Sequence, residues 1–144
     1  MKKLPIYLPM MVLFFFQISA IHSQHFGDSS SADRVHELRL NDGEKWKIDA
    51  DMVKHIRVGE DLLNEFIKRS ETDYSRLAKE LSESNNHLIF SCSMTGEAHD
   101  LLHKWLHPHL ELTAMLQKAD DPEAASKLVY KMKDSYENFN TYFQ

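Results

Sequence analysis

The residues best suited to chemistry lie in one short stretch in the second half of the chain. Cys92 and Met94 supply two sulfur atoms, and His99 and His103 follow four residues apart. On a helix, that spacing puts two imidazoles one turn apart, within reach of one ion. Thiolate, thioether and imidazole together favour copper, above all Cu(I), and zinc over hard cations. The stretch therefore predicts a site that buffers or senses a soft metal ion.

Met52 and His55 are candidates for further ligands of the same ion. They share the inner face of an earlier predicted helix, so they complete the site if the two helices are neighbours. Each candidate ligand also has an ordinary explanation. Methionine and free cysteine are common fillers of a core, and a histidine on an apolar stripe is usually a hydrogen-bonded core residue. The alternative function is a structural or protein-interaction bundle that holds no ligand.

Catalytic patterns are missing from the sequence. Neither Gly-x-Ser-x-Gly nor His-Glu-x-x-His occurs, and the four glycines stand too far apart for a phosphate-binding loop. Cys92 beside His99 or His103 could pair a nucleophile with a base. Such a pair also needs an oxyanion site and a substrate cleft, which nothing in the sequence signals. We therefore expect binding without catalysis.

The beginning of the chain reads as a targeting segment. Met1-Lys2-Lys3 is followed by an apolar run to Ile18 and then by small residues, so residues 1–20 predict a cleavable signal peptide, with Ser23 as an alternative cleavage position. The run is shorter than a bilayer span. We expect a periplasmic or secreted protein without stable membrane insertion after cleavage. Residues 21–37 are polar and predict a flexible leader, and residues 38–144 predict a single domain.

Hydrophobic periodicity predicts an all-α domain. Four amphipathic segments are expected, at residues 49–69, 72–90, 97–119 and 122–144. Short connections between them favour an up-and-down four-helix bundle. Residues 38–48 alternate around Asn41-Asp42-Gly43 and predict a short hairpin or an extended arm with a tight turn. Gly59 falls on the apolar stripe of the first helix, where it allows close helix approach or leaves room for a bound group.

The composition limits the classes of partner. A formal charge of -5 argues against a nucleic-acid binder, and a single cysteine excludes a disulfide framework. The expected partner is a metal ion or another protein. Of the nine histidines, His55, His99, His103 and His109 fall on or beside the apolar seams, whereas His107 falls on an outer face.

Two resemblances bear on this architecture. The pattern Cys-x-Met-x-Gly-x-Ala-His-Asp-x-x-His, at residues 92–103, resembles a group of small exported bacterial four-helix proteins that have no established activity. The topology is also similar to that of the soluble periplasmic b-type cytochromes, in which Met52 would occupy the place of the methionine ligand to haem. The last predicted helix contains no histidine, so haem by the same scheme is disfavoured, and a haem would need another histidine as its ligand, for instance His109.

Overall fold

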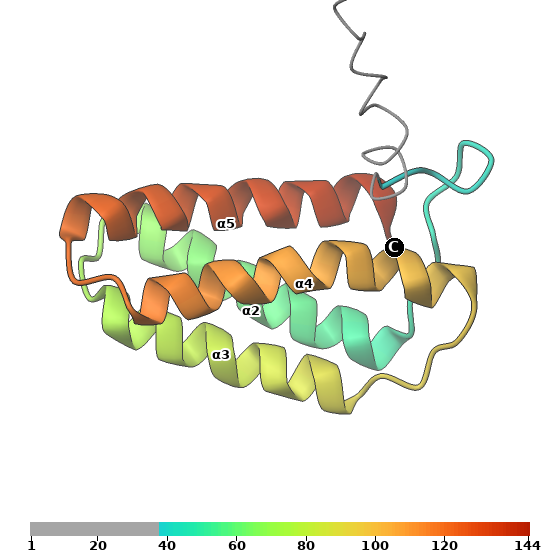
Figure 1. Ribbon diagram of the computed structural model, residues 1–144, viewed down its shortest axis with the longest axis horizontal. Coiled ribbons are helices and arrows are strands. Elements are labelled where there is room, and N and C mark those ends of the chain that lie inside the picture. Colours follow the sequence, from blue (N-terminus) through green and yellow to red (C-terminus); the bar gives the residue numbers. More distant parts are fainter. Residues whose placement is uncertain (1–37) are drawn as a thin grey trace, which may run out of the picture.

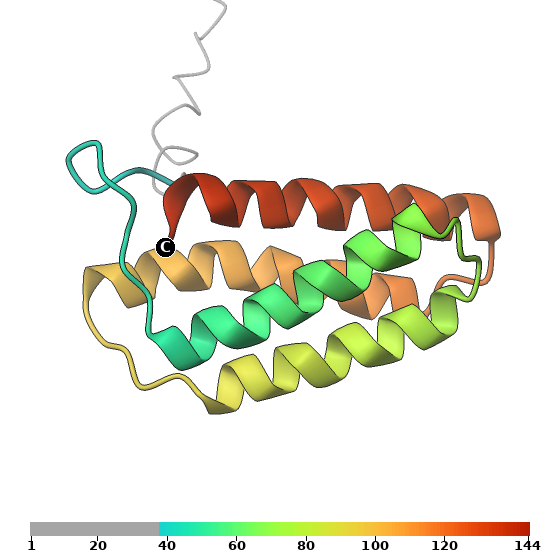
Figure 2. The same cartoon turned by 180° about the vertical axis from the view of Figure 1, so that it is seen from behind.

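A computed structural model describes residues 38–144, and within this range the chain folds into four α-helices. They are α2 (Ala50–Lys68), α3 (Tyr74–Phe90), α4 (Glu97–Gln117) and α5 (Pro122–Tyr142). Each helix packs against the next one along the chain, and α5 also contacts α2, so the bundle closes (Figure 1; Figure 2). The predicted up-and-down bundle of the all-α class is therefore confirmed.

The helix ends follow from local signals in the sequence. Asp73 and Asp121 cap α3 and α5, and each carboxylate accepts a hydrogen bond from the backbone amide three residues later. Pro122 takes the first position of α5, which proline favours. At α4 the residue before the helix is Gly96 with φ +82°. The capping position is thus held by a glycine, and no side chain of residues 38–144 accepts a hydrogen bond from the first turn of α4.

The core lies between the four helices. Its largest fully buried side chains are Phe139, Phe143, Met52, Ile56, Leu63, Leu77, Leu81, Leu88, Leu101, Leu102, Leu116 and Met132. Gly59 of α2 is buried as well, and a Cβ atom at that position would overlap the hydroxyl oxygen of Tyr136. The missing side chain thus lets the α5 aromatic ring lie against the α2 backbone. Gly59 serves close helix approach, the first of the two roles expected for it.

Residues 38–49 form the predicted arm. Asn41 and Glu44 exchange two backbone hydrogen bonds around Asp42 and Gly43, both of which have positive φ. This is the backbone of a type I′ turn, which the residue pair Asp-Gly favours. The tight turn at Gly43 is confirmed, although beyond it the arm does not continue as a hairpin.

The arm pairs instead with the end of α5. Trp46 forms a parallel bridge with Phe143, and its amide donates to the carbonyl of Tyr142 at 2.8 Å. Gln144 donates to the Trp46 carbonyl and accepts from the Ile48 amide, both at 2.9 Å. The Trp46 side chain is buried, so the arm closes one end of the bundle.

The predicted signal peptide and leader lie outside the described residues. Within residues 38–144, no helix combines the length and the apolar character that crossing a membrane requires.

Candidate functional site

Three histidines of α4 lie one above another at the surface of the bundle. The Nε2 atoms of His99 and His103 are 3.0 Å apart, and His103 Nδ1 lies 3.3 Å from His107 Nε2. The ring centroids are separated by 4.4 and 5.3 Å, and both pairs meet edge to face. Residues spaced by four share one face of a helix, which explains the alignment. We call His99, His103 and His107 the histidine ladder.

The ladder is a chain of hydrogen-bond donors and acceptors. His99 Nδ1 lies 3.7 Å from a carboxylate oxygen of Asp100, which favours a proton on Nδ1 and leaves Nε2 as an acceptor. With that tautomer, His103 donates from its Nε2 to His99 and accepts at its Nδ1 from His107, which is one of the two directions that the distances allow. All three imidazoles can therefore be neutral at once without two protons facing each other.

The central ring is biased toward the neutral form. Partial burial lowers the pKa of His103 below its ordinary value, and the neighbouring His99 and His107 oppose a further positive charge. The carboxylate of Asp100 acts in the opposite direction and is the smallest of these influences. At neutral pH His103 thus carries no charge, which is the state in which imidazole binds metal ions.

The two predicted sulfur ligands lie in the connection between α3 and α4. Cys92 and Met94 are half-buried and pack against the hydrophobic core. Across residues 38–144, no three or more histidine, cysteine, aspartate or glutamate side chains are grouped to hold one metal ion. Of the predicted ligands, His99 and His103 are the two whose ring nitrogens lie close together. Participation of either sulfur stays a prediction.

Met52 and His55 have different surroundings from each other. Met52 is buried in the core, whereas His55 is half-buried and stacks on His87 of α3, with ring centroids 5.4 Å apart and 20° between the planes. Ser84 of α3 also donates to the backbone carbonyl of His55 at 2.8 Å. The contacts of His55 thus link α2 to α3.

His109 is the histidine of α4 that enters the interior of the bundle, on a different face of the helix from the histidine ladder. Its ring stacks on Trp105 at 4.8 Å and meets Tyr136 edge-on at 4.7 Å, and its Nδ1 lies 3.0 Å from the hydroxyl of Ser135. Its Nε2 is buried and has no hydrogen-bond partner among the residues that the structure describes. Burial lowers the pKa of His109 to about 4. A haem bound here would have to displace both aromatic rings, because the interior is closely packed.

His107 is the ladder residue that sequence reasoning missed. The helical projection correctly put it on an outer face, and its side chain is exposed. It nevertheless lies within reach of His103. The signal was present in the numbering, because 99, 103 and 107 repeat the spacing that aligns side chains along a helix.

Comparison of the chain with protein-family models, with curated proteins and with solved structures finds no match. Of the resemblances seen in the sequence, the shared four-helix architecture is confirmed. Any functional conclusion therefore depends on the geometry of the chain itself.

Proposed function

We propose that the protein is a non-catalytic, exported metal-binding protein that chelates copper or zinc through His99 and His103. The observation that carries the proposal is the 3.0 Å distance between the two Nε2 atoms. With metal–nitrogen bonds of about 2.0–2.1 Å and tetrahedral angles, two nitrogens on one ion lie about 3.3 Å apart. The nitrogen separation is thus within about 0.3 Å of that of a chelating pair, and the two rings must also turn so that both lone pairs face the ion.

The surroundings of His103 support ligation. Its lowered pKa keeps the ring neutral, so binding at neutral pH does not have to displace a proton from a charged ring. When His103 Nε2 binds the ion, the ring's proton is on Nδ1, and His107 takes the tautomer with its own proton on Nδ1, so that its Nε2 accepts a hydrogen bond from His103. Metal-bound histidines usually make such a second hydrogen bond, and it holds the ring in orientation. His107 therefore acts as a positioning residue.

The chemistry of the ligands narrows the choice of ion. Imidazole nitrogens suit zinc and copper, and hard cations prefer oxygen ligands. Two protein ligands leave the other coordination positions to water or to an exchanging partner. Such an open site suits a protein that buffers or senses an ion better than one that uses the ion to hold its fold. A Cu(I) form of the site adds the thiolate of Cys92, the only thiol in the chain.

Export is part of the same proposal. The basic start, the apolar run and the small residues of positions 1–23 support secretion to the periplasm or the medium. The resemblance of residues 92–103 to small exported bacterial bundles supports the same compartment.

Titration of the purified chain with Zn(II), Cu(II) and, under reducing conditions, Cu(I) against a competing chelator tests the proposal. We expect one ion per chain. His99→Ala or His103→Ala should weaken binding at least tenfold, since loss of a partner outside the ligand set already costs about 10- to 100-fold. His87→Ala is the matched control, because it removes an exposed helical imidazole and leaves the ladder intact.

The variant Cys92→Ala distinguishes a site made by the two histidines alone from a Cu(I) site that also uses the Cys92 thiolate. A Cys92→Ala chain that retains Zn(II) affinity and loses Cu(I) affinity assigns the thiolate to the Cu(I) form alone. Uptake that is the same in the wild type and in a His99→Ala/His103→Ala double variant would show that the ladder is not a metal site, and the proposal would fail.

A further inference from the structure

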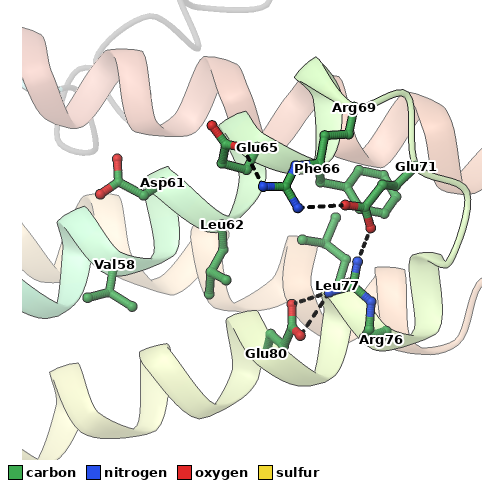
Figure 3. Close-up of a pocket in the computed structure, with 10 residues that line it drawn as sticks. All are labelled: Val58, Asp61, Leu62, Glu65, Phe66, Arg69, Glu71, Arg76, Leu77 and Glu80. Carbon is green, nitrogen blue, oxygen red and sulfur yellow. Dashed lines mark hydrogen bonds and ion pairs between the residues drawn. The ribbon is translucent and has the colours of Figure 1, made fainter.

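A groove of about 410 Å³ lies between α2 and α3, beside the turn that joins them (Figure 3). Its floor is apolar and consists of Leu62, Phe66 and Leu77, with Val58 at one end. Phe66 and Leu77 are buried, while Val58 is 45% exposed. Small-molecule sites are of this size and are mostly apolar, with a few polar groups that orient the ligand. No residue of the histidine ladder lines the groove.

The rim of the groove is charged. It carries Asp61, Glu65, Arg69, Glu71, Arg76 and Glu80. Figure 3 shows the ion pairs running across one end of the groove from α2 to α3. Arg69 pairs with Glu65 at 3.1 Å, and Arg76 pairs with Glu80 at 2.9 Å and also with Glu71. Both guanidinium groups are thus already bound to carboxylates, so they offer little to an anionic ligand.

The excess charge of the rim is negative. Four carboxylates are set against three cations, because Lys68 pairs with Glu65 in addition to the two guanidinium groups, and among residues 38–144 the carboxylate of Asp61 makes no hydrogen bond or ion pair. Hydrogen bonding and charge from Lys68 lower the pKa of Glu65, and this pairing compensates its charge, so the uncompensated charge of the rim is that of Asp61. Apolar surface next to uncompensated negative charge is complementary to a ligand that has an apolar body and a cationic end.

We propose that this groove binds a small organic cation, an ammonium group carried on an apolar body about the size of a phenyl ring. The body lies on Leu62 and Leu77, and the ammonium group faces the carboxylate of Asp61. The ion pairs of Glu71 with Arg69 and with Arg76 connect the end of α2 to the start of α3 and border one end of the groove. This site is separate from the metal site proposed above, so either can fail without the other.

Titration of the ¹⁵N-labelled chain with 2-phenylethylammonium, followed by amide chemical shifts, tests the proposal. The shifts should be confined to residues 58–80. The uncharged analogue 2-phenylethanol should bind about fivefold more weakly, as expected when one ion pair at about 4 Å in water is lost. Phenylacetate, which has the opposite charge, should cause no saturable shifts there.

Two variants test whether the carboxylate of Asp61 is the group that binds the ammonium. Asp61→Asn should reduce the affinity for the ammonium to that for the uncharged analogue, whereas Glu83→Gln, an exposed acid of α3 outside the groove, should leave it unchanged. Equal affinity for the charged and uncharged probes, shifts spread over the whole bundle, or no shifts at millimolar ligand would each overturn the proposal. Metal affinity measured on Asp61→Asn should equal that of the wild type, which keeps the two sites distinguishable.

Discussion

Acidification should destabilise the bundle through His109. The ring is 0% exposed, its Nδ1 is hydrogen-bonded to Ser135, and its Nε2 is buried without a partner. Protonation would place a charge between Trp105 and Tyr136, where no carboxylate of residues 38–144 compensates it. This burial lowers the pKa of His109 from 6.5 to about 4.

The sign of the effect follows from proton linkage. The pKa is lower in the folded state than in the unfolded state, so the unfolded chain binds more protons and the free energy of unfolding falls as the pH falls. The contribution is fully present above the unfolded pKa and is lost progressively down to the folded pKa. The loss from this one ring is about 2 kcal/mol between pH 7 and pH 5, and about 3 kcal/mol in total.

Urea denaturation followed by circular dichroism, at intervals from pH 7 to pH 5, measures this loss. His109→Phe keeps an aromatic ring against Trp105 and cannot be protonated. The difference in unfolding free energy between the wild type and this variant isolates His109 from the other titrating groups. This difference in unfolding free energy should change by about 2 kcal/mol between pH 7 and pH 5.

Parallel stability curves for the two chains would refute the reasoning. If His109→Phe does not fold, the pKa of His109 can be measured directly in the wild-type chain. An NMR titration of the histidines should show His109 with a midpoint near 4. A midpoint near the ordinary value of 6.5 would mean that water or a counter-charge reaches the ring.

Gly59→Ala should lower the free energy of unfolding by about 1–3 kcal/mol, because its Cβ would overlap the Tyr136 hydroxyl, and Tyr136→Phe should relieve part of this loss in a double-mutant cycle by urea denaturation. His103→Ala should abolish the rise in Tm that Zn(II) produces, whereas His87→Ala should retain it, as calorimetry can show. Phe90→Ser should change stability by less than about 0.5 kcal/mol, because Phe90 is 88% exposed. A larger loss on thermal denaturation would show that another surface covers the ring.

Much of the fold was accessible from the sequence because its signals are local. Asp121-Pro122 marks the start of α5 with a capping carboxylate and a residue that suits the first helical turn. The expected ends of the other helices agree with the structure to within about two residues, the usual uncertainty of helix ends. Gly59 also stood out, since a glycine on an apolar stripe needs a reason in packing.

Contacts between distant segments could not be predicted in the same way. Nothing near Trp46 indicates that its backbone pairs with Phe143. An extended arm can form backbone hydrogen bonds with any other extended segment whose amides and carbonyls are unpaired, and the sequence does not show which segment lies beside it. The groove between α2 and α3 likewise depends on the relative position of two helices. Periodicity fixes which face of each helix is apolar and says little about the spacing between two such faces.

In the candidate metal site, the positions of residues on one helix could be predicted from the sequence, whereas those of residues in a connection could not. His99 and His103 were predicted to share a face by their spacing alone, and their rings do approach. Cys92 and Met94 lie in a connection whose path no helical period describes, so closeness in sequence did not imply that their sulfur atoms point toward the ladder.

The pairing of the arm with the end of α5 also determines how the bundle responds to mechanical load. Trp46 and Phe143 run in parallel, so a force that pulls the arm and residue 144 in opposite directions acts along the two segments and not across them. The three backbone hydrogen bonds made by Trp46, Ile48 and Gln144 are then loaded together in shear. Tension on the two segments therefore reaches the helices only after all three bonds break. The strength of these three hydrogen bonds thus sets the force at which the domain begins to unfold.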